Sequence, residues 1–384
     1  MNIYMKNRIE LKDLGRQYKK NKRQIDRAIK NVIASTSFIS GKEVEILEVQ
    51  LAEYVGVEHC ITCANGTDAM TLALMAWNIG PGDAIFVPDF TFFATAEVVS
   101  LRGATPIFVD VNDRTFNMDA VDLEKAILEV KEAGHLTPKV VIPVDLFGLP
   151  ADYYAIDQVA KKYNLMVLED AAQGFGGSIN GKKACSFGDA ATTSFFPAKP
   201  LGCYGDGGAI FTQDKELADL VRSLRVHGKG KDKYDNVRIG TNSRLDTLQA
   251  AILIEKLAVL NAELEAVNRI ATNYNQSITN NLLKPVIPFN YFSSYAQYTL
   301  ICESSEQRSC LLNDLKNKGI PTSVFYPKAL SRQKAFETYP SNTRVNKTSI
   351  TLADRVVSIP MHPYLTNKEI DRIVQAINEV VTTS

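Results

Sequence analysis

Short apolar runs alternate with segments of helical periodicity from about Gln24 to Leu260. In segments such as Asp68–Trp77 and Tyr154–Tyr163, apolar residues return every three to four positions, which is typical of amphipathic helices. Several of the runs between them are nearly continuous in Val, Ile and Leu, as strands covered on both faces require. Strands are predicted at Cys60–Cys63, Ala84–Val87, Thr105–Val109, Val140–Val144, Leu165–Leu168, Ala191–Phe196 and Ala209–Phe211. This alternation predicts an α/β fold with a mostly parallel seven-stranded sheet sandwiched by helices.

The pattern changes in the last third of the chain. We predict one helix over Thr247–Leu260 and a polar connecting helix over Glu263–Ile278. After Pro285, short β-like runs mix with helical ones; these are Tyr298–Cys302, Thr322–Phe325, Glu306–Lys318 and Lys368–Val381. We therefore predict two domains. Residues 1–262 form an N-terminal segment and a large α/β domain, and residues 263–384 form the connector helix and a smaller α+β domain.

The charge balance narrows the classes of partner. The chain has 43 Lys and Arg against 43 Asp and Glu, so its formal net charge is zero. A balanced charge gives no reason to expect binding to nucleic acid or to an anionic membrane. No apolar run approaches the roughly 20 residues that span a bilayer. The N-terminus, Met1 to Lys22, is polar and lacks the apolar core of a signal peptide. We therefore expect a cytoplasmic protein.

Cys60 and Cys63 form a C-x-x-C pair, a spacing found in zinc sites and redox motifs. Residues three apart on a strand point to opposite faces of the sheet. No second C-x-x-C or H-x-x-x-H pair follows in the sequence. We therefore interpret both cysteines as small buried side chains and predict no metal site.

Polar residues follow several predicted strands, at the sheet edge where open α/β proteins bind ligands. Asn65-Gly66-Thr67-Asp68 ends one strand and opens a helix. Gly66 allows close approach to the backbone, Thr67 offers a hydroxyl, and the helix start offers free N–H groups. The segment is either a phosphate site or an ordinary helix start capped by Thr67 or Asp68.

Two further strand ends carry candidate residues. Asp170 follows the strand Leu165–Leu168, and Gln173 lies one helical turn later. The Asp170 carboxylate either pairs with a cationic ring nitrogen or caps the next helix. In Pro88–Phe93, one aromatic ring could stack on a planar cofactor, while the other two rings are expected in the core.

Lys199 lies in a loop rich in Gly, Pro and aromatic residues, five residues after Ser194. A lysine held in such a loop, with an acid at an upstream strand end, is typical of an amine that forms a Schiff base. The turn Gly205–Gly208 then returns the chain as a strand. Together the parts fit pyridoxal 5′-phosphate. Its phosphate would meet Thr67 and Ser194, its pyridine nitrogen Asp170, and its aldehyde Lys199.

These motifs resemble the DegT/DnrJ/EryC1/StrS family of sugar aminotransferases, which are fold-type I pyridoxal phosphate enzymes. The likeness runs from Ile9 to near the C-terminus. Its matching stretches are Phe38–Gly41, Asn65–Thr67, Val87-Pro88, Thr91-Phe92, Glu169–Gln173, Ser194–Lys199, Gly205–Gly208, His227-Gly228 and Gly240–Leu245. The resemblance implies the fold-type I architecture, in which a large cofactor-binding domain is joined to a smaller C-terminal one.

The resemblance also implies roles around the cofactor ring. Lys199 would form the Schiff base and Asp170 would hold the pyridine nitrogen. Gln173 would contact the ring hydroxyl, and Phe92 would stack on the ring.

The resemblance implies a second set of residues around the phosphate. Thr67, Asp68 and Ser194 would hold it beside Gly66. Asn242 would reach the phosphate of the neighbouring subunit. An active site shared in this way implies a homodimer with a large interface.

One subgroup of the family is especially similar in Phe195–Gly208, Asn242–Ala251 and Tyr295–Thr299. That subgroup aminates 3-keto nucleotide sugars, including the UDP-linked 3-keto-N-acetylglucosaminuronate used in bacterial surface polysaccharides. If the substrate is a uronate, Arg244 either binds its carboxylate with two hydrogen bonds or forms an ion pair between subunits. Tyr326 is a further candidate for a substrate contact.

Two residues depart from the family pattern. Asp206 stands where the family commonly has Glu, which is a mild change. Ser331 stands where the family commonly has His, in a loop that borders the substrate pocket. The second departure leaves the exact sugar open.

The expected activity is a ping-pong transamination from L-glutamate to C3 of a keto nucleotide sugar. Lys199 would move the proton, so its pKa must lie well below the ordinary value of about 10.4. The presence of this lysine argues against the family's dehydratases, in which it is replaced. Amination at C4 of the sugar, and a non-catalytic regulatory protein that binds nucleotide sugars, are the alternatives.

Overall fold

A seven-stranded sheet forms the centre of the computed structural model, which describes residues 8–232, 234–279, 281–339 and 345–383. The strand order is β1-β9-β8-β5-β4-β2-β3. The strands are β1 (His59–Cys63), β2 (Asp83–Pro88), β3 (Thr105–Val109), β4 (Thr137–Val141), β5 (Met166–Asp170), β8 (Ala190–Ser194) and β9 (Gly208–Thr212). All seven predicted strands are present. Strand β9 runs antiparallel to both of its neighbours, and the other pairs are parallel.

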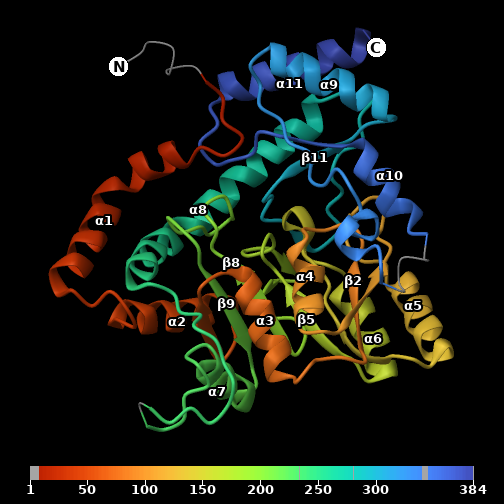
Figure 1. Ribbon diagram of the computed structural model, residues 1–384. Helices are drawn as coiled ribbons and strands as arrows, with labels where there is room; N and C mark the ends of the chain where they lie inside the picture. Colours follow the sequence, from red (N-terminus) through yellow and green to blue (C-terminus); the bar gives the residue numbers. More distant parts are fainter. Residues whose placement is uncertain (1–7, 233, 280, 340–344, 384) are drawn as a thin grey trace.

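Helices cover both faces of the sheet (Figure 1). On one face lie α3 (Gly66–Ala76), α4 (Ala94–Leu101) and α7 (Lys215–Leu224). On the other lie α2 (Lys42–Val55), α5 (Ala120–Ala133), α6 (Tyr153–Tyr163) and part of α8 (Thr247–Ser277). Alternate residues of each strand enter opposite layers, as in β2, where Val87 and Phe86 belong to different core clusters. The predicted sandwich is confirmed.

The same alternation places the two cysteines of the C-x-x-C pair. Cys60 packs with α2 and α8, whereas Cys63 packs with α3 on the opposite face. Both thiols are buried and free, and burial raises the pKa of each. The prediction that they are small core residues is confirmed. Within the described ranges, no group of three or more His, Cys, Asp or Glu could hold a metal ion.

Helix α8 joins the two parts of the molecule. It runs for 31 residues without a break, so the prediction of two helices over this stretch was wrong. Its first half packs Leu253 and Leu260 on the sheet layer, and its second half packs Ile270 and Tyr274 in the core of the smaller domain. Asn261 and Glu265 lie on the exposed side of this continuous helix, whereas Glu263 is half-buried. The predicted domain boundary therefore falls inside α8, and it stays a prediction.

The smaller domain is built on a two-stranded antiparallel sheet. Its elements are β11 (Tyr298–Ile301), β12 (Val356–Ile359), α9 (Ser305–Asn317), α10 (Lys347–Arg355) and α11 (Asn367–Thr383). Thr322–Phe325 was predicted as a β-like run but forms only an isolated bridge, between Ser323 and Ser358. Phe325 instead turns toward the large domain. The short elements are β6 (Ser178–Ile179), β7 (Lys182–Lys183), β10 (Tyr291–Phe292), η2 (Leu146–Gly148), η3 (Leu330–Arg332) and η4 (Lys334–Phe336).

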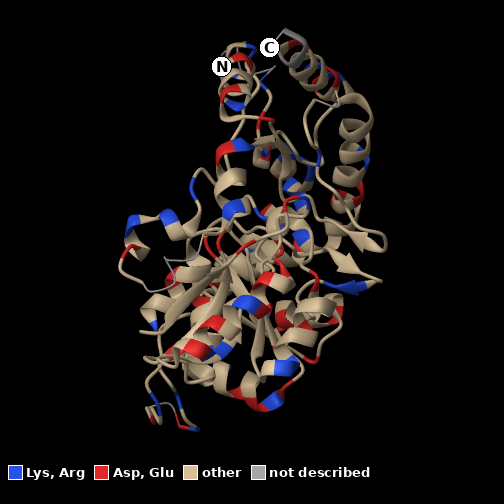
Figure 2. Ribbon diagram, turned by 90° about the vertical axis from the view of Figure 1, so that its right-hand side faces the viewer, with Lys and Arg blue, Asp and Glu red and all other residues tan. Residues whose placement is uncertain are grey.

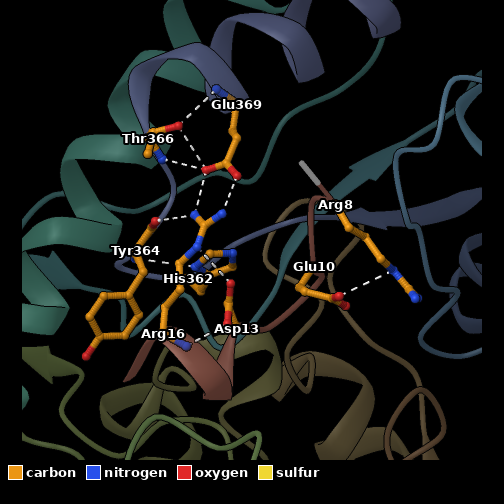
Figure 3. Close-up of polar contacts among 8 residues, drawn as sticks. All are labelled: Arg8, Glu10, Asp13, Arg16, His362, Tyr364, Thr366 and Glu369. Atoms are coloured by element: carbon orange, nitrogen blue, oxygen red, sulfur yellow. Dashed lines mark hydrogen bonds and ion pairs between the residues drawn. The ribbon is translucent and has the colours of Figure 1, made fainter. Parts of the chain in front are cut away.

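The N-terminal segment crosses between the domains, which the sequence pattern did not predict. Helix α1 (Leu14–Ser35) packs along α8, and Ile9 is buried in the core of the smaller domain. The guanidinium of Arg16 holds the Glu369 carboxylate of α11 with two hydrogen bonds, of 2.8 and 2.6 Å (Figure 3). The segment assigned to the large domain thus also stabilises the small one.

Charged residues are distributed without a dominant sign. Basic and acidic positions intermingle over both domains in the view of Figure 2. This agrees with the zero net charge of the chain. None of the helices within the described ranges is both long and apolar enough to cross a bilayer.

Candidate active site

An open cavity of about 510 Å³ lies at the carboxyl ends of the parallel strands. This is the sheet edge at which the sequence predicted a ligand. The predicted residues that line it are Gly66, Thr67, Phe92, Asp170, Gln173, Ser194, Lys199 and Tyr326. They come from four strand ends and from the smaller domain, so the fold brings together residues up to 260 positions apart.

Asp170 is a buried acid at the end of β5. One carboxylate oxygen accepts from the amide of Ala172 (3.1 Å), and the other accepts from the hydroxyl of Thr95 (3.0 Å). Burial raises the pKa of Asp170, while these hydrogen bonds and the charge of Lys199 act in the opposite direction. Thr95 was missed in the sequence. Thr95 lies in the first turn of α4, just after the segment that follows β2, and its hydroxyl is 3.4 Å from that of Thr91.

Lys199 lies in a loop, Phe195–Cys203, whose shape is fixed by two hydrogen bonds. The amide of Cys203 donates to the carbonyl of Phe195 (2.7 Å), and the buried amine of Lys256 donates to the carbonyl of Gly202. Burial lowers the pKa of Lys199, and the opposing charge of Asp170 partly offsets this effect. The lysine amine and the acid therefore interact electrostatically within one cavity.

The start of α3 forms the third part of the site. The side chain of Asn65 caps this helix by accepting from the amide of Asp68 (2.8 Å), so neither Thr67 nor Asp68 is the cap. A Cβ atom added to Gly66 would lie 2.8 Å from the Cβ of Ser194, which no real side chain tolerates. Glycine therefore lets the helix start and Ser194 approach each other. The side chain of Asp68 does not line the cavity, and its role stays a prediction.

Tyr326 closes the cavity from the smaller domain. Its hydroxyl accepts from the side-chain amide of Gln173 (3.2 Å), whose oxygen accepts from the amide of Phe147 (2.8 Å). This second bond fixes which way the Gln173 amide points. The ring of Phe92 is 54% exposed and lies 6.0 Å, centre to centre, from the ring of Tyr326. Phe92 thus presents a free aromatic face to the cavity.

Comparison with known proteins places the chain in a family. The profile of the DegT/DnrJ/EryC1/StrS aminotransferase family matches residues 19–378. The chain belongs to this family. It is 45% identical to UDP-2-acetamido-2-deoxy-3-oxo-D-glucuronate aminotransferase of Pseudomonas aeruginosa, over 96% of this chain and 99% of the relative.

Solved structures of the family agree with the fold. A DegT/DnrJ/EryC1/StrS aminotransferase from Brucella abortus is 48% identical with a TM-score of 0.94, covering 97% of this chain and 99% of that one. NtdA of Bacillus subtilis, solved with bound cofactor PMP, is 29% identical with a TM-score of 0.87, covering 94% and 82%. The aminotransferase assignment and the fold-type I architecture expected from the sequence are confirmed.

Two residues predicted from the DegT/DnrJ/EryC1/StrS pattern lie apart from the cavity. Asn242 is exposed and pairs by backbone with Val226, and Arg244 is half-buried nearby. Neither side chain lines the cavity of its own chain. Their predicted roles, toward a neighbouring subunit and toward a substrate carboxylate, stay predictions.

Ser331, which stands where the family commonly has His, is hydrogen-bonded to a buried acid. Its hydroxyl donates to one oxygen of the Asp89 carboxylate (2.7 Å) and its amide donates to the other (2.6 Å). The amide nitrogen of the Asn346 side chain adds a third bond to Asp89 (3.0 Å). Ser331 is buried and does not line the cavity of its own chain. It joins the smaller domain to the segment that carries Phe92.

Proposed function

We propose that this aminotransferase moves the amino group of L-glutamate to C3 of a nucleotide-linked 3-keto sugar, for bacterial surface polysaccharide. The observation that carries the proposal is the placement of Lys199 and Asp170 in one cavity, with each altering the pKa of the other. The relative in Pseudomonas aeruginosa, named for a 3-oxo-glucuronate substrate, supports the choice of carbon.

The cofactor is pyridoxal 5′-phosphate, and the residues of the cavity fit it. Asp170 suits a cationic ring nitrogen. The start of α3 and the hydroxyl of Ser194, which Gly66 allows to lie close together, suit a phosphate. Lys199 suits the aldehyde, and Phe92 offers a face for stacking. When bound, the cofactor supplies an electron sink that stabilises the charge left as a proton leaves Cα of the amino acid.

Lys199 holds and moves the proton. Its amine must be neutral to accept one, and burial lowers its pKa in that direction. Asp170 acts against this shift because a nearby negative charge stabilises the ammonium form. When Asp170 is paired with a cationic ring instead, less of its field reaches Lys199. We therefore expect ligand binding at Asp170 to make the amine a better base.

The working unit that we propose is a cytoplasmic homodimer. Asn242, which is exposed on its own chain, would complete the phosphate site of the partner. Tyr234 and Ile239, in the loop before it, are 86% and 89% exposed. Large apolar side chains this exposed favour an interface over a solvated surface.

Colour and product analysis test the proposal. Protein incubated with pyridoxal phosphate should turn yellow and should bleach when L-glutamate is added. The resulting pyridoxamine form is then offered a panel of keto nucleotide sugars, and NMR identifies the aminated carbon. Amination at C4 would replace the C3 assignment.

Lys199→Ala should abolish both half-reactions. A wild-type protein that stays colourless, and that pyridoxal phosphate cannot reconstitute, would favour a regulatory protein that binds nucleotide sugars. If Lys199→Ala kept full turnover, the assignment of Lys199 would be wrong.

A further inference from the structure

A second, smaller cavity borders the active site. It measures about 50 Å³ and shares Ala198 and Lys199 with the larger cavity. Its other walls come from the N-terminal segment, from α8, from Ser294–Ala296, from the prolines beside Lys199, and from the loop before α11. A buried water needs roughly 10–15 Å³ of such a cavity. The space therefore suits roughly three to five water-sized atoms, which is enough for a carboxylate group.

His362 presents an unpaired donor in this cavity. Its side chain is 3% exposed, and Nε2 has no hydrogen-bond partner among the residues that the structure describes. Its Nδ1 accepts from the amide of Tyr364 (3.3 Å; Figure 3). Burial lowers the pKa of His362 to about 4, so the ring is neutral. A neutral imidazole that accepts at Nδ1 carries its proton on Nε2.

Lys12 adds a positive charge to the same space. Its amine interacts electrostatically with Lys199, with Glu263 and with His362. Burial lowers the pKa of Lys12 to about 8, which leaves it mostly charged near pH 7. Within the described residues, the amine of Lys12 neither donates a hydrogen bond nor forms an ion pair.

Glu263 acts on that charge through space, but the hydrogen bonds to its two oxygens come from other residues. One of its oxygens accepts from the hydroxyl of Tyr364 and the other accepts from the side-chain amide of Gln17 (2.9 Å). The remaining unpaired atom, the oxygen of Gln17, is an acceptor that a water could satisfy. Lys12 and His362 can therefore turn a cationic amine and a neutral N–H toward a ligand that only accepts hydrogen bonds.

We propose that this cavity is a carboxylate subsite of the transamination, with Lys12 and His362 as its donors. The inference rests on the proposed function and narrows it, because a carboxylate bound here belongs to a molecule whose reacting carbon reaches Lys199. Both L-glutamate and a uronate sugar carry such a group. The shared chemistry is a carboxylate, and the experiment separates the two sources.

The test uses Lys12→Met in the full-length holoenzyme, with Lys12→Arg as the conservative variant. Lys19→Met, a change of an exposed lysine on α1, is the matched control. Stopped-flow absorbance follows three half-reactions: with L-glutamate, with the 3-keto uronate nucleotide sugar, and with its 6-hydroxymethyl counterpart. Calorimetry measures binding of 2-oxoglutarate and of the aminated uronate product to cofactor-free protein, which gives a readout independent of turnover.

If glutamate is the source of the carboxylate, Lys12→Met should slow the glutamate half-reaction and weaken 2-oxoglutarate binding by roughly 10- to 100-fold. The half-reactions with both sugars should stay unchanged. If the uronate is the source, only the half-reaction with the uronate sugar and the binding of its aminated product should fall by this factor. Lys12→Arg should restore most of the loss in either case. Equal losses in all three half-reactions, or none, would overturn the subsite. A wild-type enzyme that aminates neither sugar would instead refute the proposed function.

Discussion

The Asp170 carboxylate accepts one side-chain hydrogen bond from another element. Thr95 of α4 donates to its carboxylate (3.0 Å), and burial otherwise raises the pKa of this acid. We expect Thr95→Val to lower kcat about fivefold, because one hydrogen bond to a buried group contributes about 1 kcal/mol. Ser100→Ala on the same helix removes a buried hydroxyl that has no partner in the described structure, and it should leave kcat unchanged. Steady-state kinetics of the two variants decide this.

A pair of buried acids lies behind Asp170. Glu169 accepts from two backbone amides, of Cys185 (2.6 Å) and Phe187 (2.8 Å), so both of its oxygens act as acceptors. Asp145 accepts from Tyr153 at one oxygen, while its other oxygen has no partner among the described residues. Burial raises the pKa of Asp145 to about 7 and also raises that of Glu169. We infer that the proton of this pair resides on Asp145.

This inference makes Asp145→Asn and Glu169→Gln unequal. An amide at 145 mimics the protonated acid and should change the free energy of unfolding by under about 1 kcal/mol. An amide at 169 would face two N–H donors and should cost about 1–3 kcal/mol. Because its folded pKa is raised, Asp145 should make the wild type lose stability as pH rises from about 4 to about 7, and Asp145→Asn should abolish this slope. Urea unfolding across this range is the measurement.

At the level of elements, α1 and α11 are tied by one ion pair. The side chains of Arg16 and Glu369 are 33% and 15% exposed, and Arg16 also donates to the carbonyl of Tyr364 (2.9 Å). The hydrogen bond from Arg16 is the main cause that lowers the pKa of Glu369 to about 2. The pair thus anchors the N-terminal segment, which carries Lys12, to the smaller domain.

Removing that pair should destabilise the protein in a pH-dependent way. We expect Arg16→Met to cost about 1–3 kcal/mol at pH 7. Because the folded pKa of Glu369 is depressed, its contribution is complete above about pH 4.5 and is lost as pH falls toward 2. The wild type and the variant should therefore converge in acid. Glu265→Gln breaks a pair with Arg269 that is 71% exposed on both sides, and it should change stability little. Equal losses in both variants would show that the Arg16–Glu369 pair contributes no more than an exposed ion pair.

On the scale of the whole molecule, the proposed dimer predicts complementation. Lys199→Ala leaves Asn242 intact for the partner, whereas Asn242→Asp leaves Lys199 intact. Each variant alone should be nearly inactive. When equal amounts are unfolded together and refolded, half of the dimers are mixed, and each mixed dimer has one intact site. Activity should recover to about one quarter of the wild-type value. If mixed dimers form but no activity returns, Asn242 acts in the active site of its own chain.

Local chemistry determined the part of the site that lies on strand ends. Periodicity located the seven strands, and parallel strands place their carboxyl ends on one edge, so Asp170, Ser194 and Lys199 could be grouped from the sequence. The long helix α8 could not be delimited in this way, because its polar positions near 262 resemble a break. The N-terminal helix α1 was missed because its few buried positions, such as Ile25 and Val32, are separated by many charged residues.

The sequence by itself determined the sheet, its helical layers, and the order of cofactor residues along the chain. These follow from period-two and period-3.6 patterns and from turn chemistry, which are properties of neighbouring residues. Only the tertiary structure decided which distant groups meet: Thr95 with Asp170, Ser331 with Asp89, and Lys12 beside Lys199 and His362. Such pairings depend on how layers pack, and burial then sets the protonation of each group, which no local pattern encodes.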